Sequence, residues 1–184
     1  PALAVDYAKI ACQHIRDEVG VSVLEYTQDL QKLITVNNYI AGHCDDAIEH
    51  GWIQVYYQPV IRTLTGAVCG MEALARWNDP VVGFLSPARF IPILEKNHDI
   101  YKLDCYILRQ TCQALRRRLD QQLPVVPVSF NLSRLDFFLC DIFQVVEDTV
   151  RTYGLPRDLI HLEITETMLV HDKEVIKEAL GRFL

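Results

Sequence analysis

Two acidic side chains and one amide stand in segments that otherwise have the pattern of buried strands. Glu72 lies in "GMEALARW", Asn131 in "VSFNLS" and Glu163 in "LIHLEIT". A carboxylate in a protein interior is costly unless a cation or hydrogen-bond donors pair with it. Carboxylate and amide oxygens are hard ligands, which favours Mg²⁺, Mn²⁺ or Ca²⁺ and disfavours zinc. These three residues are therefore candidate metal ligands.

An arginine close to these candidates indicates the charge of a substrate. Side chains alternate between the two faces of a strand, so Arg76 shares a face with Glu72. An arginine beside a metal site favours an anionic substrate, most often a phosphate. The combination favours metal-assisted phosphoester chemistry. A structural alternative stays open, in which Glu72 pairs with Arg76 and Asn131 caps the next turn.

From Trp52 onward the sequence alternates between strand and helix patterns. Two strands joined around Thr65-Gly66 form a predicted hairpin. After it we expect helices over 86–97 and 100–120, a strand ending at Asn131, a helix over 140–153, the strand that carries Glu163, and a helix from about 172. This order is typical of α/β proteins with a parallel sheet and crossover helices, either an open sheet or a (β/α) barrel.

The polar candidates share a position in these predicted strands. Gln58, Glu72, Asn131 and Glu163 lie at or near the carboxyl ends, the edge where such folds build their sites. The sequence therefore predicts that they converge on one mouth, with the opposite face of the second strand packed against outer helices through Met71, Ala73, Ala75 and Trp77. Glu166 falls past the end of its strand, where it either braces a loop or lies on the surface.

The N-terminal region has a different pattern. A helix is predicted over 1–18, a short strand over 20–26, and one amphipathic helix from Thr27 to His50, closed by Gly51. Two small elements before Thr27 cannot bury a core of their own. The long helix either connects two domains or packs on the domain that follows.

Composition excludes several classes of protein. A net charge of −6 and a pI near 5.5 argue against binding to a nucleic-acid polymer. Six cysteines without a C-x-x-C pair favour reduced thiols in a cytoplasmic protein. No uncharged stretch is long enough to span a membrane, so we expect no membrane contact within this segment. The chain starts without methionine and stops inside an apparently unfinished helix, so we expect it to be a truncated segment.

Five blocks, in order, resemble one known family: "YYQPVI", "GMEALARW", "LSPARFIPILEK", "VSFNLS" and "LEITETML". They are similar to the first half of the EAL domain, the bacterial cyclic di-GMP phosphodiesterase domain. The resemblance implies a TIM-like (β/α) barrel whose first strand is antiparallel. It also implies hydrolysis of one phosphodiester bond of cyclic di-GMP to linear pGpG, with two Mg²⁺ or Mn²⁺ ions, and leaves room for an EAL homodimer.

The resemblance also assigns roles to residues. It implies that Glu72, Asn131 and Glu163 are metal ligands, that Gln58 and Arg76 contact the substrate, and that Glu166 supports a metal-binding loop. Residues 1–26 resemble, more weakly, the end of a GGDEF domain, 27–51 the connecting helix, and 52–184 the truncated N-terminal half of the EAL domain.

Part of the family pattern is absent from these 184 residues. The D-D-F-G loop with its two aspartate ligands, a later lysine and glutamate, and a final glutamine would all follow Leu184. A complete barrel takes roughly 200 to 250 residues, so about half a barrel is present. We expect the parent protein to be an active bacterial signalling phosphodiesterase and this segment alone to be inactive. The alternative is a degenerate EAL domain that binds cyclic di-GMP or a protein partner without hydrolysis.

Overall fold

The computed structural model describes residues 5, 8, 12, 25–164 and 181–182. The elements predicted before residue 25 fall largely outside these ranges. Glu166 also lies outside them, as does the helix predicted from about 172 except for residues 181–182. The chain divides into two compact units, Pro1–Ile40 and Ala41–Leu184. The second unit carries the sheet and its crossover helices.

The single helix predicted from Thr27 to His50 is two helices in the structure. Helix α2 spans Gln28–Gly42, and Thr27 begins it as predicted, because its Oγ1 accepts a hydrogen bond from the Leu30 amide at 3.1 Å. Helix α3 spans Cys44–Glu49. The break at His43 follows Gly42, a residue type that is about 1 kcal/mol less favourable than alanine inside a helix. The prediction of one continuous helix is wrong at this point.

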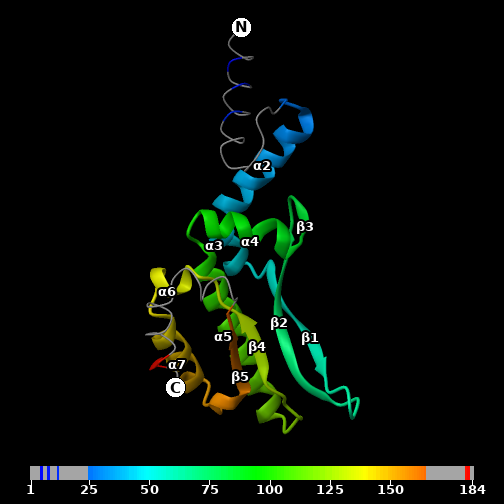
Figure 1. The fold of residues 1–184 in the computed structure, drawn as a ribbon, viewed down its shortest axis with the longest axis vertical. Helices are drawn as coiled ribbons and strands as arrows, with labels where there is room; N and C mark the ends of the chain where they lie inside the picture. The colour runs from blue at the N-terminus through cyan, green and yellow to red at the C-terminus, as the bar shows by residue number, and fades with distance from the viewer. Residues whose placement is uncertain (1–4, 6–7, 9–11, 13–24, 165–180, 183–184) are drawn as a thin grey trace. The chain divides into compact units, whose positions relative to one another are not determined.

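The sheet of the second unit has five strands. Strand β1 pairs antiparallel with β2, which pairs parallel with β4, and β4 pairs parallel with β5; the short β3 pairs antiparallel with β2 (Figure 1). The strands are β1 (Ile53–Ile61), β2 (Val68–Asp79), β3 (Gly83–Leu85), β4 (Val128–Asn131) and β5 (Ile160–Glu163). The predicted α/β fold with an antiparallel first strand is confirmed, and β3 is an element that the sequence did not predict. Within the described residues the sheet is open, with β1 and β5 at its edges.

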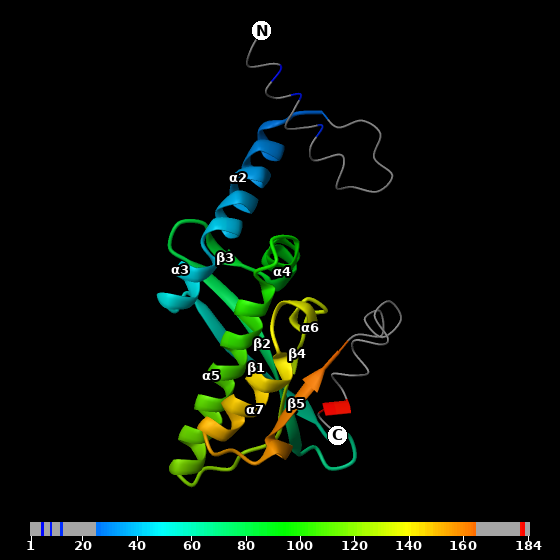
Figure 2. The same cartoon turned by 90° about the vertical axis from the view of Figure 1, so that its left-hand side faces the viewer.

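Helices connect the parallel strands and cover one face of the sheet. They are α4 (Pro87–Lys96), α5 (Ile100–Asp120), α6 (Asp136–Leu139), α7 (Ile142–Thr152) and the 3₁₀ turn η1 (Arg157–Leu159). Apolar residues recur in α5 at helical spacing and are buried: Ile100, Leu103, Ile107, Leu108, Cys112 and Leu115. Figures 1 and 2 show α5 and α7 side by side on the same side of the sheet.

The covered face of the sheet forms the core. Trp77 on β2 is fully buried and meets the ring of Phe90 on α4 edge-on, with the centroids 5.8 Å apart. Tyr106 on α5 donates a hydrogen bond from its hydroxyl to the Ile53 carbonyl at 3.0 Å. The predicted packing of the Trp77 face against the outer helices is confirmed. Lys102 ties α3 to α5 through an ion pair with Asp45, at 2.8 Å.

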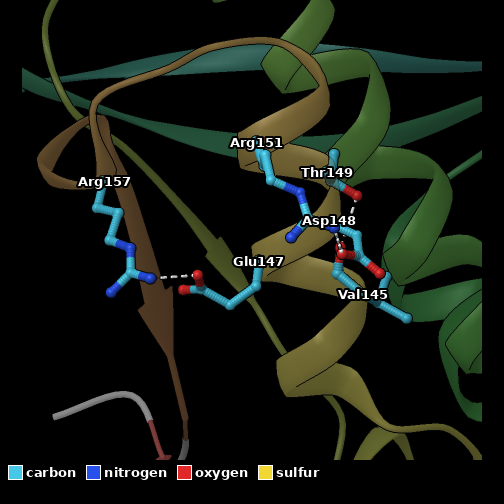
Figure 3. Close-up of polar contacts among 6 residues, drawn as sticks. All are labelled: Val145, Glu147, Asp148, Thr149, Arg151 and Arg157. Carbon is cyan, nitrogen blue, oxygen red and sulfur yellow. Dashed lines mark hydrogen bonds and ion pairs between the residues drawn. The ribbon is translucent and has the colours of Figure 1, made fainter.

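In the last crossover, one ion pair joins α7 to the turn before β5. Figure 3 shows Arg157 of η1 reaching across to Glu147 on α7, with which it forms an ion pair. Along α7, Arg151 pairs with Asp148, and the Thr149 hydroxyl donates to the Val145 carbonyl at 2.6 Å. The Arg157–Glu147 pair thus joins η1 to α7, while the other two contacts lie within α7.

Two further observations concern the chain as a whole. None of the described helices has the length and apolar character needed to cross a bilayer. All six cysteines are free thiols.

Candidate functional site

Strand register brings the three predicted metal ligands to the face of the sheet opposite the helices. Glu72 on β2 pairs with Ser129 on β4, and two residues further along β4 Asn131 pairs with Glu163 on β5. Residues paired across parallel strands share a face, and neighbouring strands lie about 4.8 Å apart. Glu72, Asn131 and Glu163 therefore project from three adjacent strands on one face.

Glu72 and Asn131 are in direct contact. The Asn131 side-chain Nδ2 donates to Glu72 Oε1 at 2.9 Å, a bond to a charged acceptor. Asn131 and Glu163 are exposed and Glu72 is half-buried, so the three side chains face an accessible surface. The side-chain oxygen of Asn131 takes no part in this bond.

The donor set fits a hard divalent cation. Two carboxylates and one amide supply oxygen atoms only, as Mg²⁺ and Mn²⁺ require. Across the described ranges, no group of three or more His, Cys, Asp or Glu side chains is arranged to hold a metal ion. Glu72, Asn131 and Glu163 bring two carboxylates and one amide to this face, and their role as metal ligands stays a prediction.

Arg76 lies further along the same face of β2 than Glu72. At about 3.3 Å per residue, the two Cα atoms are separated by about 13 Å of strand. Arg76 donates from Nη1 to the Ala75 carbonyl at 2.8 Å, and its guanidinium carbon lies 5.8 Å from the ring centroid of Tyr56. Glu72 bonds to Asn131, and no ion pair between described residues joins it to Arg76. The structural alternative of a Glu72–Arg76 pair is therefore not what the structure shows.

Gln58 reaches the site by a different route from the one predicted. It pairs with Glu72 across the hairpin and is exposed on the same face. Because β1 is antiparallel, its carboxyl end lies at the opposite edge of the sheet from those of β4 and β5. Glu72 also lies well inside β2, which continues to Asp79. The prediction that all four residues mark strand ends at one mouth is right for Asn131 and Glu163 and wrong for Gln58 and Glu72, which are aligned by register.

The loop after Asn131 is held by three acidic side chains that the sequence analysis did not single out. The Ser133 amide donates to Asp136 Oδ2 at 2.7 Å and to Asp104 Oδ2 at 3.3 Å. The Ser133 hydroxyl donates to Glu95 Oε1 at 3.0 Å. These acids come from three helices, α4, α5 and α6. One residue before Ser133, the Leu132 amide donates to the carbonyl of Glu163 at 2.9 Å.

Two sequence signals could have found this cluster. Asp104 lies four residues after Ile100 and four before Leu108, on the apolar stripe of α5, where a carboxylate needs a partner. Ser133-x-x-Asp136 has the capping-box spacing, in which the side chain of the later residue accepts a hydrogen bond from the backbone amide three positions earlier. Burial raises the pKa of both Asp104 and Asp136.

The family follows from a comparison over most of the chain. The EAL domain family matches residues 42–183. This chain belongs to the EAL domain family. Among curated relatives, the oxygen sensor protein DosP of Escherichia coli K12 is 30% identical over 168 residues, covering 91% of this EAL chain and 21% of DosP. The uncharacterized protein Mb1392c of Mycobacterium bovis is 32% identical over 136 residues, covering 72% of the chain and 44% of that protein. The chain thus spans less than half the length of each.

Solved EAL structures match the fold. The PaMucR phosphodiesterase in its c-di-GMP complex has a TM-score of 0.70 and 25% identity, covering 78% of this chain and 60% of that one. The EAL enzyme Bd1971, in the form bound to cAMP and cyclic di-GMP, has a TM-score of 0.70 and 28% identity, covering 85% of this chain and 42% of the other. These matches agree with the α/β architecture.

Proposed function

We propose that the EAL domain of this chain binds cyclic di-GMP and hydrolyses one phosphodiester bond to give linear pGpG, with Mg²⁺ or Mn²⁺. The observation that carries the proposal is the contact between Glu72 and Asn131 on an exposed sheet face, with Glu163 opposite Asn131 in register. The PaMucR phosphodiesterase and the enzyme Bd1971 support it, since both were solved with cyclic di-GMP and are 25% and 28% identical.

The residues present divide into two roles in this proposal. Glu72, Asn131 and Glu163 hold the metal, and the Asn131 amide orients the Glu72 carboxylate through their hydrogen bond. A bound Mg²⁺ or Mn²⁺ supplies charge neutralisation at the phosphate and activation of the attacking water. Carboxylates fixed by rigid strands hold such geometry better than carboxylates on loops.

Arg76 and Gln58 act on the substrate in the same proposal. Arg76 lies about 13 Å along β2 from Glu72, too far to join the metal cluster but well placed for another part of a dinucleotide. Its guanidinium lies over the ring of Tyr56, 5.8 Å from the centroid, and offers planar paired donors of the kind that bind a phosphate. Gln58, directly across from Glu72, offers an amide to the substrate beside the metal site.

The remaining assignments are part of the same proposal. Glu166 supports a metal-binding loop, residues 1–26 are the end of a GGDEF-like domain, and 27–51 connect it to the EAL domain. The protein acts in the bacterial cytoplasm and can pair with a second EAL domain.

The test uses the complete protein that contains these 184 residues. Purified protein is incubated with cyclic di-GMP and Mg²⁺ or Mn²⁺, and pGpG is followed by chromatography beside a Glu72→Ala variant. Product formed by the parent and not by the variant supports the proposal. Binding measured with Ca²⁺, without product in either metal, would make the protein a cyclic di-GMP receptor instead. Neither binding nor product would overturn the proposed function.

A further inference from the structure

The loop that positions Asn131 is held by two carboxyl groups that compete for one donor. Asp136 Oδ2 and Asp104 Oδ2 both accept from the Ser133 amide, at 2.7 and 3.3 Å. Asp136 is completely buried, and its other oxygen, Oδ1, has no hydrogen-bond donor in the described structure. Two ionised carboxylates facing one N–H in such a place would repel each other strongly.

Among the described residues, Glu95 is the charged side chain outside the pair that acts on both aspartates, while Arg109 acts on the neighbouring Cys105. The titratable groups that face the pair are Glu95 on α4, Cys105 on α5 and Cys140 after α6. Burial raises the pKa of both aspartates, and Glu95 raises both further. Each carboxyl also acts on the titration of the other, so the two behave as one coupled pair.

We propose that Asp104 and Asp136 share one proton, and that this singly protonated pair positions the loop after Asn131 for the Glu72 site. The two acids are positioning residues, because they touch the Ser133 backbone and not the proposed ligands. Ser133 follows Asn131 by two residues, and Leu132 between them is bonded to the Glu163 carbonyl. A shift of Ser133 therefore moves Asn131 relative to both Glu72 and Glu163. This inference rests on the proposed function for its effect on catalysis, but not for the shared proton itself.

The proposal predicts how pH acts on the fold. A carboxyl group with a raised pKa keeps its proton in the folded state at a pH where the unfolded chain has lost it. The contribution of this pair to folding stability is then fully present below the ordinary pKa of aspartate and is lost as pH rises through the raised pKa. Loss of the shared proton leaves two charges at Ser133, which release the loop and withdraw the Asn131 amide from Glu72.

The experiment compares two substitutions of Asp104 in the complete protein. Asp104→Asn replaces the shared proton with a permanent N–H donor, whereas Asp104→Ala removes the donor. The matched control is Asp120→Asn at the end of the same helix, where Asp120 is exposed and pairs with Arg116. The melting temperature is measured from pH 5 to 9 without metal or nucleotide, and kcat and KM for cyclic di-GMP are measured over the same range.

We expect the melting temperature of the parent and of Asp120→Asn to fall as pH rises, and the slope to flatten in Asp104→Asn. Asp136→Asn should flatten it as well. We expect Asp104→Ala to lower kcat by about ten- to a hundredfold with a smaller change in KM, since misplacement of about 1 Å can cost a hundredfold. Asp104→Asn should restore most of that loss and remove the parent's decline in kcat at high pH.

A melting curve for Asp104→Asn that follows the parent at every pH overturns the shared proton. A kcat profile for Asp104→Asn that declines with the parent overturns the positioning role. Failure of the proposed function is distinguishable, because in that case no protein forms pGpG while the melting temperatures still decide whether the pair shares a proton.

Discussion

Substitution of Glu72 by glutamine tests the metal site with little disturbance of the fold. The glutamine side chain has nearly the same shape and retains an oxygen that can accept the hydrogen bond from Asn131 Nδ2, now at 2.9 Å. The change therefore removes a negative charge from the half-buried position between Gln58 and Ser129 while keeping the local geometry.

The expected magnitudes for stability and catalysis differ enough to be separated. A hydrogen bond to a charged group contributes about 1.5–3 kcal/mol and a neutral one about 0.5–1.5 kcal/mol, so the fold should lose about 1–1.5 kcal/mol. Removing one preorganised electrostatic group from an active site typically costs a factor of about 10² to 10³ in kcat, or about 3–4 kcal/mol. Turnover should therefore fall far more than stability, because the charge on Glu72 matters most when charge develops at the phosphate.

The assay measures turnover and binding separately. Formation of pGpG with Mn²⁺ gives kcat, and titration with Ca²⁺ in place of the active metal gives the dissociation constant of cyclic di-GMP. Glu147→Gln is the matched control, because it makes the same chemical change on α7, where Glu147 pairs with Arg157 on the outer layer. We expect this control to retain parental kcat and to lose about 1 kcal/mol or less of stability.

Two outcomes would contradict the reasoning. A Glu72→Gln variant with kcat within about threefold of the parent would show that Glu72 holds no essential metal. Weaker binding of cyclic di-GMP with an unchanged kcat would instead make Glu72 a substrate contact, since a uniform binding interaction affects affinity and not kcat.

Two further predictions address the substrate contact and the core. Arg76→Ala should weaken cyclic di-GMP binding by about 1.5–3 kcal/mol, measured by titration calorimetry with Ca²⁺. The control Arg151→Ala, at an exposed residue of α7, should leave the affinity unchanged. An affinity of Arg76→Ala within twofold of the parent would assign Arg76 a structural role only. Phe90→Ala should lower the free energy of unfolding, measured in urea, by about 3–5 kcal/mol, because Phe90 is fully buried against Trp77. The control Phe84→Ala, at a residue that is 62% exposed, should change the free energy of unfolding by about 0.5 kcal/mol or less. Similar losses in the two phenylalanine variants would contradict the assigned core.

Local patterns in the sequence determined the elements and the chemical types of the site residues. The alternation of apolar and polar residues placed β2 and β4, and Ser86-Pro87 and the turn at Thr65-Gly66 marked where α4 begins and where the hairpin folds. These signals are local, since they depend on side-chain periodicity and on turn and cap residues a few positions apart. The residue types of Glu72, Asn131 and Glu163 likewise indicate oxygen ligands, because the donor atoms belong to the side chains themselves and do not depend on the fold.

Only the tertiary structure decided how these residues meet. Glu72 and Asn131 are 59 positions apart, and their contact depends on the register between β2 and β4. Register is set by which side chains pack against the helices, so no short segment contains it. The same reason explains why the sequence pattern does not reveal that Gln58 meets Glu72 through antiparallel pairing, or that Asp104 and Asp136 converge on Ser133. Each position depends on an element that is remote in sequence and adjacent only in the folded chain.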